Sequence, residues 1–247
     1  MRVGLCEFEV KNNIGIIHLT NQKQNLIDEP EFTDADFIKQ WVDREHLKGV
    51  VITGRGRHFS GGANLQSIWR LTGEPIKLSS GLDKGKQLLE TLENLPVPTV
   101  AAINGTCLGA GLEISLACTF RFSVPNAIIG FPEAGWGLIP GLAGVNRTLD
   151  HLDKATALKM ILRAELLRAE DALALKLIHK IVPKNEIIDY CIQFIEKIIA
   201  DRPIEVIRAI TNSINNHKKL PTDEALRYDT MTFVALALKA QKQMVAN

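Results

Sequence analysis

The first alternation of apolar and polar side chains spans residues 3–20 and is interrupted by Lys11, Asn12 and Asn13. Alternation with a period of two is typical of a strand that buries one face, and paired asparagines are common in tight turns. We therefore predict a β-hairpin over residues 3–20.

Two further segments are almost entirely apolar, residues 50–52 and residues 99–103 with Thr99 at the start, and glycine-rich stretches follow them at residues 54–62 and 104–111. Unbroken apolar runs are typical of strands that are buried on both faces of a parallel sheet. The carboxyl ends of such strands meet at the edge of the sheet where ligands bind. We therefore expect both glycine-rich loops to lie at one functional site.

Apolar residues at helical spacing predict helices between and after these strands. Thr33 and Asp36 form an approximate capping box for a helix that ends near His46, and Ser80 is placed to cap a helix that Pro96 stops. The remaining predicted elements are a helix over residues 112–118, strands over 119–124 and 128–131, and helices from about residue 141 almost to the end. The pattern predicts an α/β core followed by a helical C-terminal third.

The composition is that of a globular protein. Of the 247 residues, 46% are hydrophobic and 23% are charged. The 29 Lys and Arg residues balance 28 Asp and Glu residues, so the formal charge is +1 and we expect no nucleic acid partner. The sequence shows no signal peptide and no apolar run long enough to span a membrane. We expect a cytoplasmic protein without a membrane partner.

Cysteine and histidine spacing gives no sign of a metal site. The four cysteines include no CxxC pair, and the six histidines include no HExxH motif. We therefore expect reduced thiols, no metal and no redox cofactor.

Neither glycine-rich loop fits a nucleotide-binding motif. The dinucleotide motif needs a third glycine where this chain has Phe59 or Ile114, and neither loop contains the Gly-Lys-Ser/Thr of a P-loop. The nucleophile elbow of serine hydrolases does not fit either, because His58 stands two residues before Ser60. These absences disfavour phosphoryl transfer and serine hydrolysis.

Two carboxylates follow the second loop: Glu113 in the helix after it and Glu133 in a glycine-flanked segment. Backbone N–H groups from two glycine-rich turns can form an oxyanion hole, and the second turn opens a helix whose dipole favours negative charge. A pair of acids beside such amides suits proton chemistry at the carbons α and β to a carbonyl. We therefore take Glu113 and Glu133 as candidate catalytic residues.

At these residues the sequence resembles the crotonase, or enoyl-CoA hydratase/isomerase, superfamily over about residues 5–215. The motifs that carry the resemblance are FSGGANL at residues 59–65, AAINGTCLGAGLE at 101–113, FPE at 131–133 and GLIPG at 137–141. The resemblance implies a crotonase (ClpP/crotonase-like) α/β fold, a spiral of ββα units with a helical C-terminal part. We expect the core over residues 1–195. Residues 196–247 would then mediate trimerisation and cover the pocket.

The resemblance also implies an activity, the hydration of an enoyl-CoA to a 3-hydroxyacyl-CoA. The backbone N–H groups of Gly61 and Ala110 would hold the thioester oxygen, and Glu113 and Glu133 would be the two acids. Coenzyme A would enter as part of the substrate, with no separate cofactor. The implied assembly is a homotrimer or a hexamer.

Five further residues are candidates for binding the substrate or its CoA portion: Gly62, Ala63, Asn64, Lys23 and Trp136. Asn64 stands where the family pattern usually has aspartate, and the alternative role for it is a helix N-cap. Lys23 is a candidate for the CoA phosphates, although a lysine in a polar turn is usually solvated. Trp136 is a candidate for the acyl pocket, with core packing as its alternative.

Other functions stay open at this stage. Glu113 has the alternative of a half-exposed surface residue, and Glu133 that of a turn or helix cap. The fold also hosts isomerases, dehydratases of carrier-protein thioesters, decarboxylases and thioester hydrolases. Outside enzymes, the alternative is a binding protein that keeps the fold without turnover.

Overall fold

In the computed structural model, which describes residues 1–246 and side chains as far as residue 242, two β-sheets lie at the centre of the fold. The larger sheet contains, in spatial order, β1 (Arg2–Val3), β2 (Cys6–Lys11), β3 (Ile14–Leu19), β4 (Gly49–Gly54), β5 (Thr99–Ile103), β7 (Phe120–Ser123) and β10 (Lys180–Ile181). The smaller sheet contains β6 (Cys107–Leu108), β8 (Ile128–Gly130) and β9 (Leu166–Arg168). All pairings from β3 to β10 are parallel.

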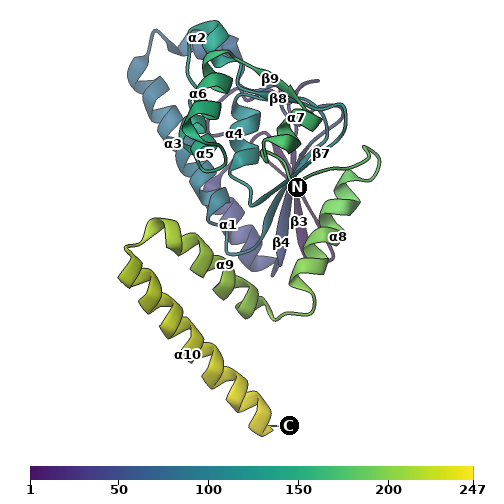
Figure 1. Ribbon diagram of the computed structural model, residues 1–247, viewed down its shortest axis with the longest axis vertical. Coiled ribbons are helices and arrows are strands. Elements are labelled where there is room, and N and C mark those ends of the chain that lie inside the picture. The colour runs from purple at the N-terminus through teal and green to yellow at the C-terminus, as the bar shows by residue number, and fades with distance from the viewer. Residues whose placement is uncertain (247) are drawn as a thin grey trace.

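Helices surround the two sheets or extend beyond them. They are α1 (Ala35–Arg44), α2 (Leu65–Leu71), α3 (Pro75–Glu93), α4 (Ala110–Leu116), α5 (Gly144–Leu149), α6 (Lys154–Leu162), α7 (Ala169–Ala174), α8 (Ile187–Ile199), α9 (Ile204–Lys219) and α10 (Thr222–Ala246), with the 3-10 helix η1 (Glu133–Trp136). Figure 1 shows α1 and α3 on one side of the strands and α8 on the other. The predicted α/β architecture is confirmed.

The predicted hairpin is formed by β2 and β3. Its turn residues Asn12 and Asn13 have φ angles of 54° and 60°, which asparagine tolerates better than most residues. All six residues of β3 are buried, because β4 continues the sheet beyond it with Ile14 opposite Gly49. This strand therefore belongs to the core rather than to a solvent-facing ribbon.

The predicted buried strands are β4 and β5, and they bring the two glycine-rich loops together. The N–H of Ser60 donates to the carbonyl of Thr106 (3.0 Å), and the N–H of Leu108 donates to the carbonyl of Ser60 (3.0 Å). The loops after β4 and β5 thus form one surface at the carboxyl ends of the parallel strands, as their order in the sequence predicts.

Two helix starts differ from the prediction. The N-cap of α1 is Asp34, whose carboxylate accepts a hydrogen bond from the N–H of Phe37, rather than Thr33. Helix α3 begins at Pro75 instead of near Ser80, because the fixed φ of proline suits the first position of a helix and five more residues extend it.

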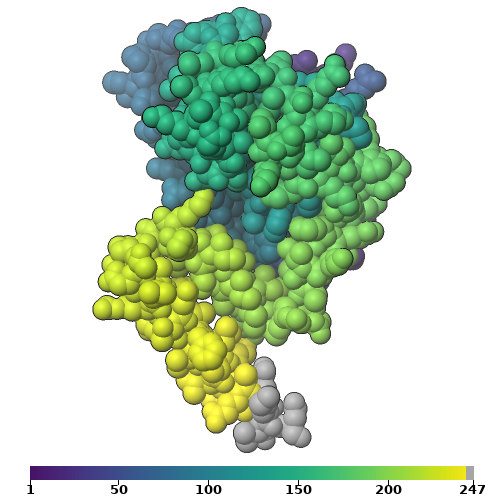
Figure 2. All heavy atoms as spheres, in the orientation of Figure 1, coloured from purple at the N-terminus to yellow at the C-terminus, as the bar shows by residue number. Residues whose placement is uncertain are grey.

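The segment after residue 141 is not entirely helical. β9 and β10 are strands of three and two residues that pair with β8 and β7. The predicted core boundary at residue 195 falls inside α8, which packs against β4, β5 and β7. Beyond it, α9 and α10 lie past the end of the sheet, and α10 reaches away from the core with the C-terminus at its far end (Figures 1 and 2).

Candidate active site

An apolar cavity of about 240 Å³ lies where the loops after β4 and β5 meet α2, α3 and η1. Helices α2 and α3 contribute Leu65, Ile68, Leu71, Leu78 and Leu82 to its wall. The ionisable carboxyl groups that line it, among the residues the structure describes, are those of Asp28, Glu113 and Glu133. The cavity is therefore suited to an aliphatic group whose reacting carbons lie beside acids.

Glu113 lies on α4 and is only 1% exposed, so the alternative of a half-exposed surface glutamate is wrong. Its Oε1 accepts hydrogen bonds from the backbone N–H groups of Leu142 and Gly144, each at 2.7 Å. A Cβ atom added at Gly144 would lie 2.8 Å from Oε1, so glycine allows this close approach. The start of α5 thus holds the Glu113 carboxyl in place.

Glu133 begins η1 and lines the same cavity. Its Oε2 is buried and accepts no hydrogen bond from any described residue. The carboxyl lies over Gly109, where an added Cβ atom would come within 2.5 Å of Oε1, and the φ of Gly109 is +50°. Glycine is needed there both for the backbone conformation and for the space.

Burial dominates the electrostatics of both acids. Desolvation raises the pKa of Glu113 to about 7, against the hydrogen bonds from Gly144 and Leu142 that lower it, and the charge of Glu133 raises it further. Desolvation also raises the pKa of Glu133 to about 7. The pKa values of both carboxyls are therefore raised toward neutral pH, the range that suits general acid–base catalysis.

One of the two proposed oxyanion amides is already engaged. The N–H of Gly61 donates to the carbonyl of Gln24 at 2.8 Å, so the structure contradicts the expectation that this group is available to a ligand. The N–H groups of Ala63 and Ala110 donate to no acceptor among the described residues, and both residues line the cavity. The two amides available to a ligand are those of Ala63 and Ala110. The Gly61 N–H is bonded to the carbonyl of Gln24, whose loop packs beside the loops at the strand ends.

The other candidate binding residues occupy different positions. Asn64 caps α2, its Oδ1 accepting from the N–H of Gln66, so the N-cap alternative is observed. Gly62 and Trp136 line the cavity, and Trp136 is 59% exposed at its edge. Lys23 is exposed and lines neither the cavity nor the groove beside it.

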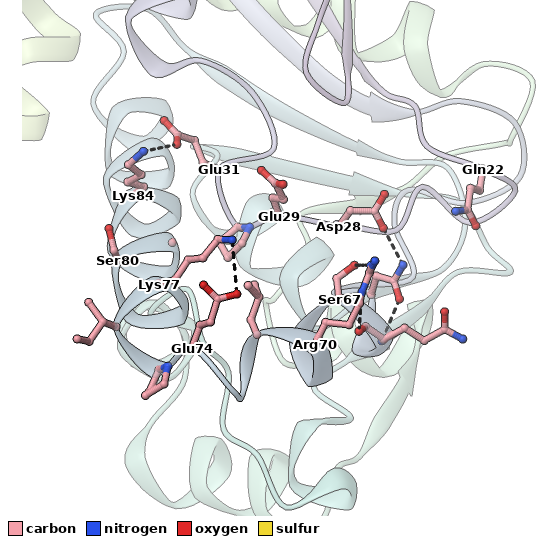
Figure 3. A pocket seen from close by; sticks show the side chains of 17 residues that line it. Gln22, Asp28, Glu29, Glu31, Ser67, Arg70, Glu74, Lys77, Ser80 and Lys84 are labelled. Atoms are coloured by element: carbon pink, nitrogen blue, oxygen red, sulfur yellow. Dashed lines mark hydrogen bonds and ion pairs between the residues drawn. The ribbon is translucent and has the colours of Figure 1, made fainter.

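A polar groove continues from the cavity between α2, α3 and residues 28–31 (Figure 3). Two of its lysines are paired with acids, Lys77 with Glu74 at 3.8 Å and Lys84 with Glu31 at 3.2 Å. Arg70 instead donates to the hydroxyl of Ser67 at 3.0 Å and forms no ion pair with a described residue. Among the described basic residues of this groove, Arg70 is therefore the one whose charge is available to an anion.

Sequence reasoning did not identify several of these groups. The N–H groups of Leu142 and Gly144, the carboxyl of Asp28 and the guanidinium of Arg70 reach the site from segments without a motif of their own. The GLIPG motif at residues 137–141, directly before Leu142, was the one signal that pointed to this region.

Within residues 1–246, no group of three or more His, Cys, Asp or Glu side chains is arranged to hold a metal ion. None of the described helices combines the length and the apolar character that a membrane crossing needs.

Comparison with known proteins extends the picture. The family model described as enoyl-CoA hydratase/isomerase matches residues 9–246. An enoyl-CoA hydratase from Polaromonas sp. JS666 superposes with a TM-score of 0.84 at 23% identity, covering 94% of this chain and 91% of that one. An enoyl-CoA hydratase from Bacillus anthracis gives a TM-score of 0.81 at 24% identity, covering 97% and 96%.

A third similar structure contains a ligand. A Thermobifida fusca YX protein solved in complex with CoA gives a TM-score of 0.78 at 20% identity, covering 97% of this chain and 95% of that one. At these identities the structural matches show a shared fold.

Proposed function

The chain belongs to the enoyl-CoA hydratase/isomerase family and has the crotonase fold, and from that premise we propose that it adds water across the 2,3 double bond of an enoyl-CoA thioester to give 3-hydroxyacyl-CoA. One observation carries the proposal: two acids with different hydrogen-bond environments, Glu113 and Glu133, line one apolar cavity. Hydration requires a base for the proton of water and an acid that delivers a proton to the α-carbon. The pair supplies both.

The two hydrogen-bond environments support different roles for the two acids in the proposed reaction. Two N–H donors on Oε1 favour the ionised form of Glu113, which makes it the base that takes a proton from water. The buried Oε2 of Glu133 has no donor among the described residues, which favours the protonated form and makes Glu133 the acid. One proton shared between the two carboxyls is the active state.

The amides of Ala63 and Ala110 are the proposed oxyanion hole. As water adds to the β-carbon, negative charge develops on the thioester oxygen, and two N–H groups at the cavity wall would stabilise it. Losing one such donor typically costs a factor of 10² to 10³ in kcat. Gly61 would then support the loop through its bond to Gln24 rather than bind substrate.

Coenzyme A is the proposed carrier. The apolar cavity would take the acyl chain, and the adjoining polar groove would take part of the CoA, with Arg70 beside a phosphate. The bound CoA in the Thermobifida fusca protein supports this assignment. No metal or redox cofactor takes part in the proposed reaction.

The test is turnover of enoyl-CoA thioesters of short, long and branched chains, followed at the enoyl thioester absorbance. We expect Glu113→Gln to lower hydration by about 10²–10⁴, while 3-enoyl to 2-enoyl isomerisation persists through Glu133. Glu133→Gln should abolish both reactions. Glu186→Gln is the matched control, because Glu186 is exposed at the start of α8, away from the cavity.

Each alternative function predicts a different result. Hydration by Glu113→Gln at the wild-type rate would contradict the two-acid mechanism and favour an isomerase. Activity with carrier-protein thioesters alone would point to a dehydratase of such substrates. Tight CoA binding without turnover of any thioester would point to a binding protein.

A further inference from the structure

We propose that Asp28 and Asn64 act together as a clamp that positions the Ala63 amide, so that both are positioning residues for the oxyanion hole. The inference rests on the proposed function, because it assumes that the Ala63 N–H binds a thioester oxygen. Asn64 lies in the FSGGANL motif, whereas Asp28 lies outside the four motifs quoted above.

Asn64 uses both ends of its side-chain amide. Its Oδ1 accepts from the N–H of Gln66 at 3.1 Å, which caps α2, and its Nδ2 donates to Oδ1 of Asp28 at 2.7 Å. An aspartate at position 64 would retain the cap but would have no proton to donate to Asp28. The asparagine is therefore matched to the residue opposite it.

Asp28 is held from its other side as well. Its Oδ2 accepts from Nδ2 of Asn21 at 2.7 Å, and the same Asn21 nitrogen donates to the carbonyl of Leu26 at 2.6 Å. Both carboxylate oxygens thus bond to amide donors, and Asp28 lines both the cavity and the groove. Figure 3 shows Asp28 linked toward α2 at the wall of the groove.

Backbone hydrogen bonds carry this link to Ala63. The N–H of Ile27 donates to the carbonyl of Gly62 at 2.9 Å, and the N–H of Asn64 donates to the carbonyl of Ile27 at 2.8 Å. Ala63 lies between these anchored groups, directly opposite Ile27, and its own N–H has no acceptor among the described residues. Fixing Asn64 against Asp28 therefore fixes the direction of the Ala63 amide.

The clamp explains why position 64 departs from the usual aspartate of the family pattern. The pair carries a single negative charge, and in this chain it lies on Asp28. Exchanging the residues would preserve every contact: an asparagine at 28 offers its oxygen to Asn21 and its nitrogen to an aspartate at 64, which still caps α2. This reciprocity gives a sharp test.

The experiment measures kcat and KM of Asn64→Asp, Asp28→Asn and the double variant with an enoyl-CoA that the wild type hydrates. Asn64→Asp places two carboxylates in contact, and we expect kcat to fall about 10- to 100-fold with a smaller change in KM, because the amide acts mainly in the transition state. Asp28→Asn loses one hydrogen bond, and its kcat should fall less than that of Asn64→Asp. The double variant should return to within about three-fold of wild type.

A matched control exists on the β2–β3 turn. Nδ2 of Asn12 donates to Oε1 of Glu196 at 3.0 Å in an exposed pair away from the cavity. Asn12→Asp creates the same contact between carboxylates there, and it should leave kcat and KM unchanged.

The outcomes separate the clamp from the proposed function. If the wild type hydrates enoyl-CoA and Asn64→Asp does so with unchanged kcat, or if the folded double variant does not recover, the clamp is overturned and the proposed function stands. If Asn64→Asp does not fold, the test compares Asp28→Asn with the double variant: the clamp requires a lower kcat in Asp28→Asn and recovery of kcat in the double variant.

A wild type without turnover contradicts the proposed function instead. Amide hydrogen exchange then tests the clamp directly, because the N–H groups of Ile27 and Asn64 should lose protection in Asn64→Asp and regain it in the double variant. Equal protection in all variants would overturn the clamp.

Discussion

At the scale of single residues, the two glutamates of the site differ in their hydrogen-bond partners rather than in their side chains. Glu113 and Glu133 are both buried enough to raise their pKa values to about 7, yet one accepts two backbone hydrogen bonds and the other leaves an oxygen without a donor. The residue type alone does not distinguish a base from an acid. In the proposed mechanism the N–H groups around each carboxyl make that distinction, and those that contact Glu113 come from a separate loop.

The raised pKa of Glu133 has a consequence for stability. The folded protein holds this proton more tightly than the unfolded chain, so the stabilisation is complete below about pH 4.5 and is lost as the pH rises toward 7. Glu133→Gln is neutral at every pH and escapes that loss. We expect the variant to match wild type near pH 4.5 and to be more stable by about 1–3 kcal/mol at pH 8.

Urea unfolding at pH 4.5, 6 and 8, at one protein concentration, measures this difference. Glu186→Gln is the control for the loss of a carboxylate at an exposed position. A Glu133→Gln protein that is less stable than wild type at pH 8 would show that the buried carboxylate is stabilised by its surroundings.

At the scale of elements, α2 connects the two halves of the site. Leu65, Ile68 and Leu71 line the apolar cavity, while Ser67 and Arg70 line the polar groove. A single seven-residue helix therefore meets both the acyl chain and the carrier in the proposed complex, each with one face.

This division predicts how Arg70→Gln should behave. The guanidinium forms no ion pair with a described residue, so it is available to a CoA phosphate, and a charge-assisted hydrogen bond contributes about 1.5–3 kcal/mol. We expect KM for an enoyl-CoA to rise about ten-fold or more with kcat nearly unchanged.

Steady-state kinetics with an enoyl-CoA and with the corresponding N-acetylcysteamine thioester, which lacks phosphates, distinguish the causes. The KM of Arg70→Gln should rise only with the CoA substrate. Arg163→Gln, at the exposed end of α6, is the control. An equal loss with both thioesters would mean that Arg70 supports α2 and does not contact the phosphate.

Elements with a strong local signal were predictable from the sequence, and contacts between distant segments were not. The alternation of residues 3–20 and the apolar runs at 50–52 and 99–103 gave the correct strands, because burial alone determines them. β9 and β10 were missed because strands of two or three residues have no period and depend on distant partners.

The same limit applies to the amides of the proposed oxyanion hole. The FSGGANL motif locates the loop, but several consecutive amides are available in it. Gln24, from a different loop, engages the Gly61 N–H and leaves that of Ala63 available. Only this tertiary contact determines which amide of the loop lacks an acceptor, so the sequence predicted the loop but not the Gly61–Gln24 hydrogen bond.

At the scale of the whole molecule, α9 and α10 expose several large apolar side chains. Among their described side chains, the exposed large apolar ones are Ile210, Ile214, Leu226, Met231, Phe233, Val234 and Leu238. Single exposed apolar residues are ordinary, but so many on two adjacent helices would suit a surface that another chain covers. Figure 2 shows these helices standing out from the remainder of the molecule.

We therefore expect a homotrimer, or a hexamer built from trimers, with α9 and α10 in the interfaces. Burying one large apolar side chain contributes about 1.5–3 kcal/mol, so several per chain are enough to hold an assembly at micromolar concentration. Light scattering after size exclusion should give three or six times the chain mass of 27.3 kDa.

Phe233→Glu places a charge on this surface and should shift the protein toward the monomer, whereas Ile76→Glu, on the exposed start of α3, should leave the mass unchanged. A wild-type monomer at micromolar concentration would contradict the assembly, and α10 would then need another explanation for its exposed apolar residues.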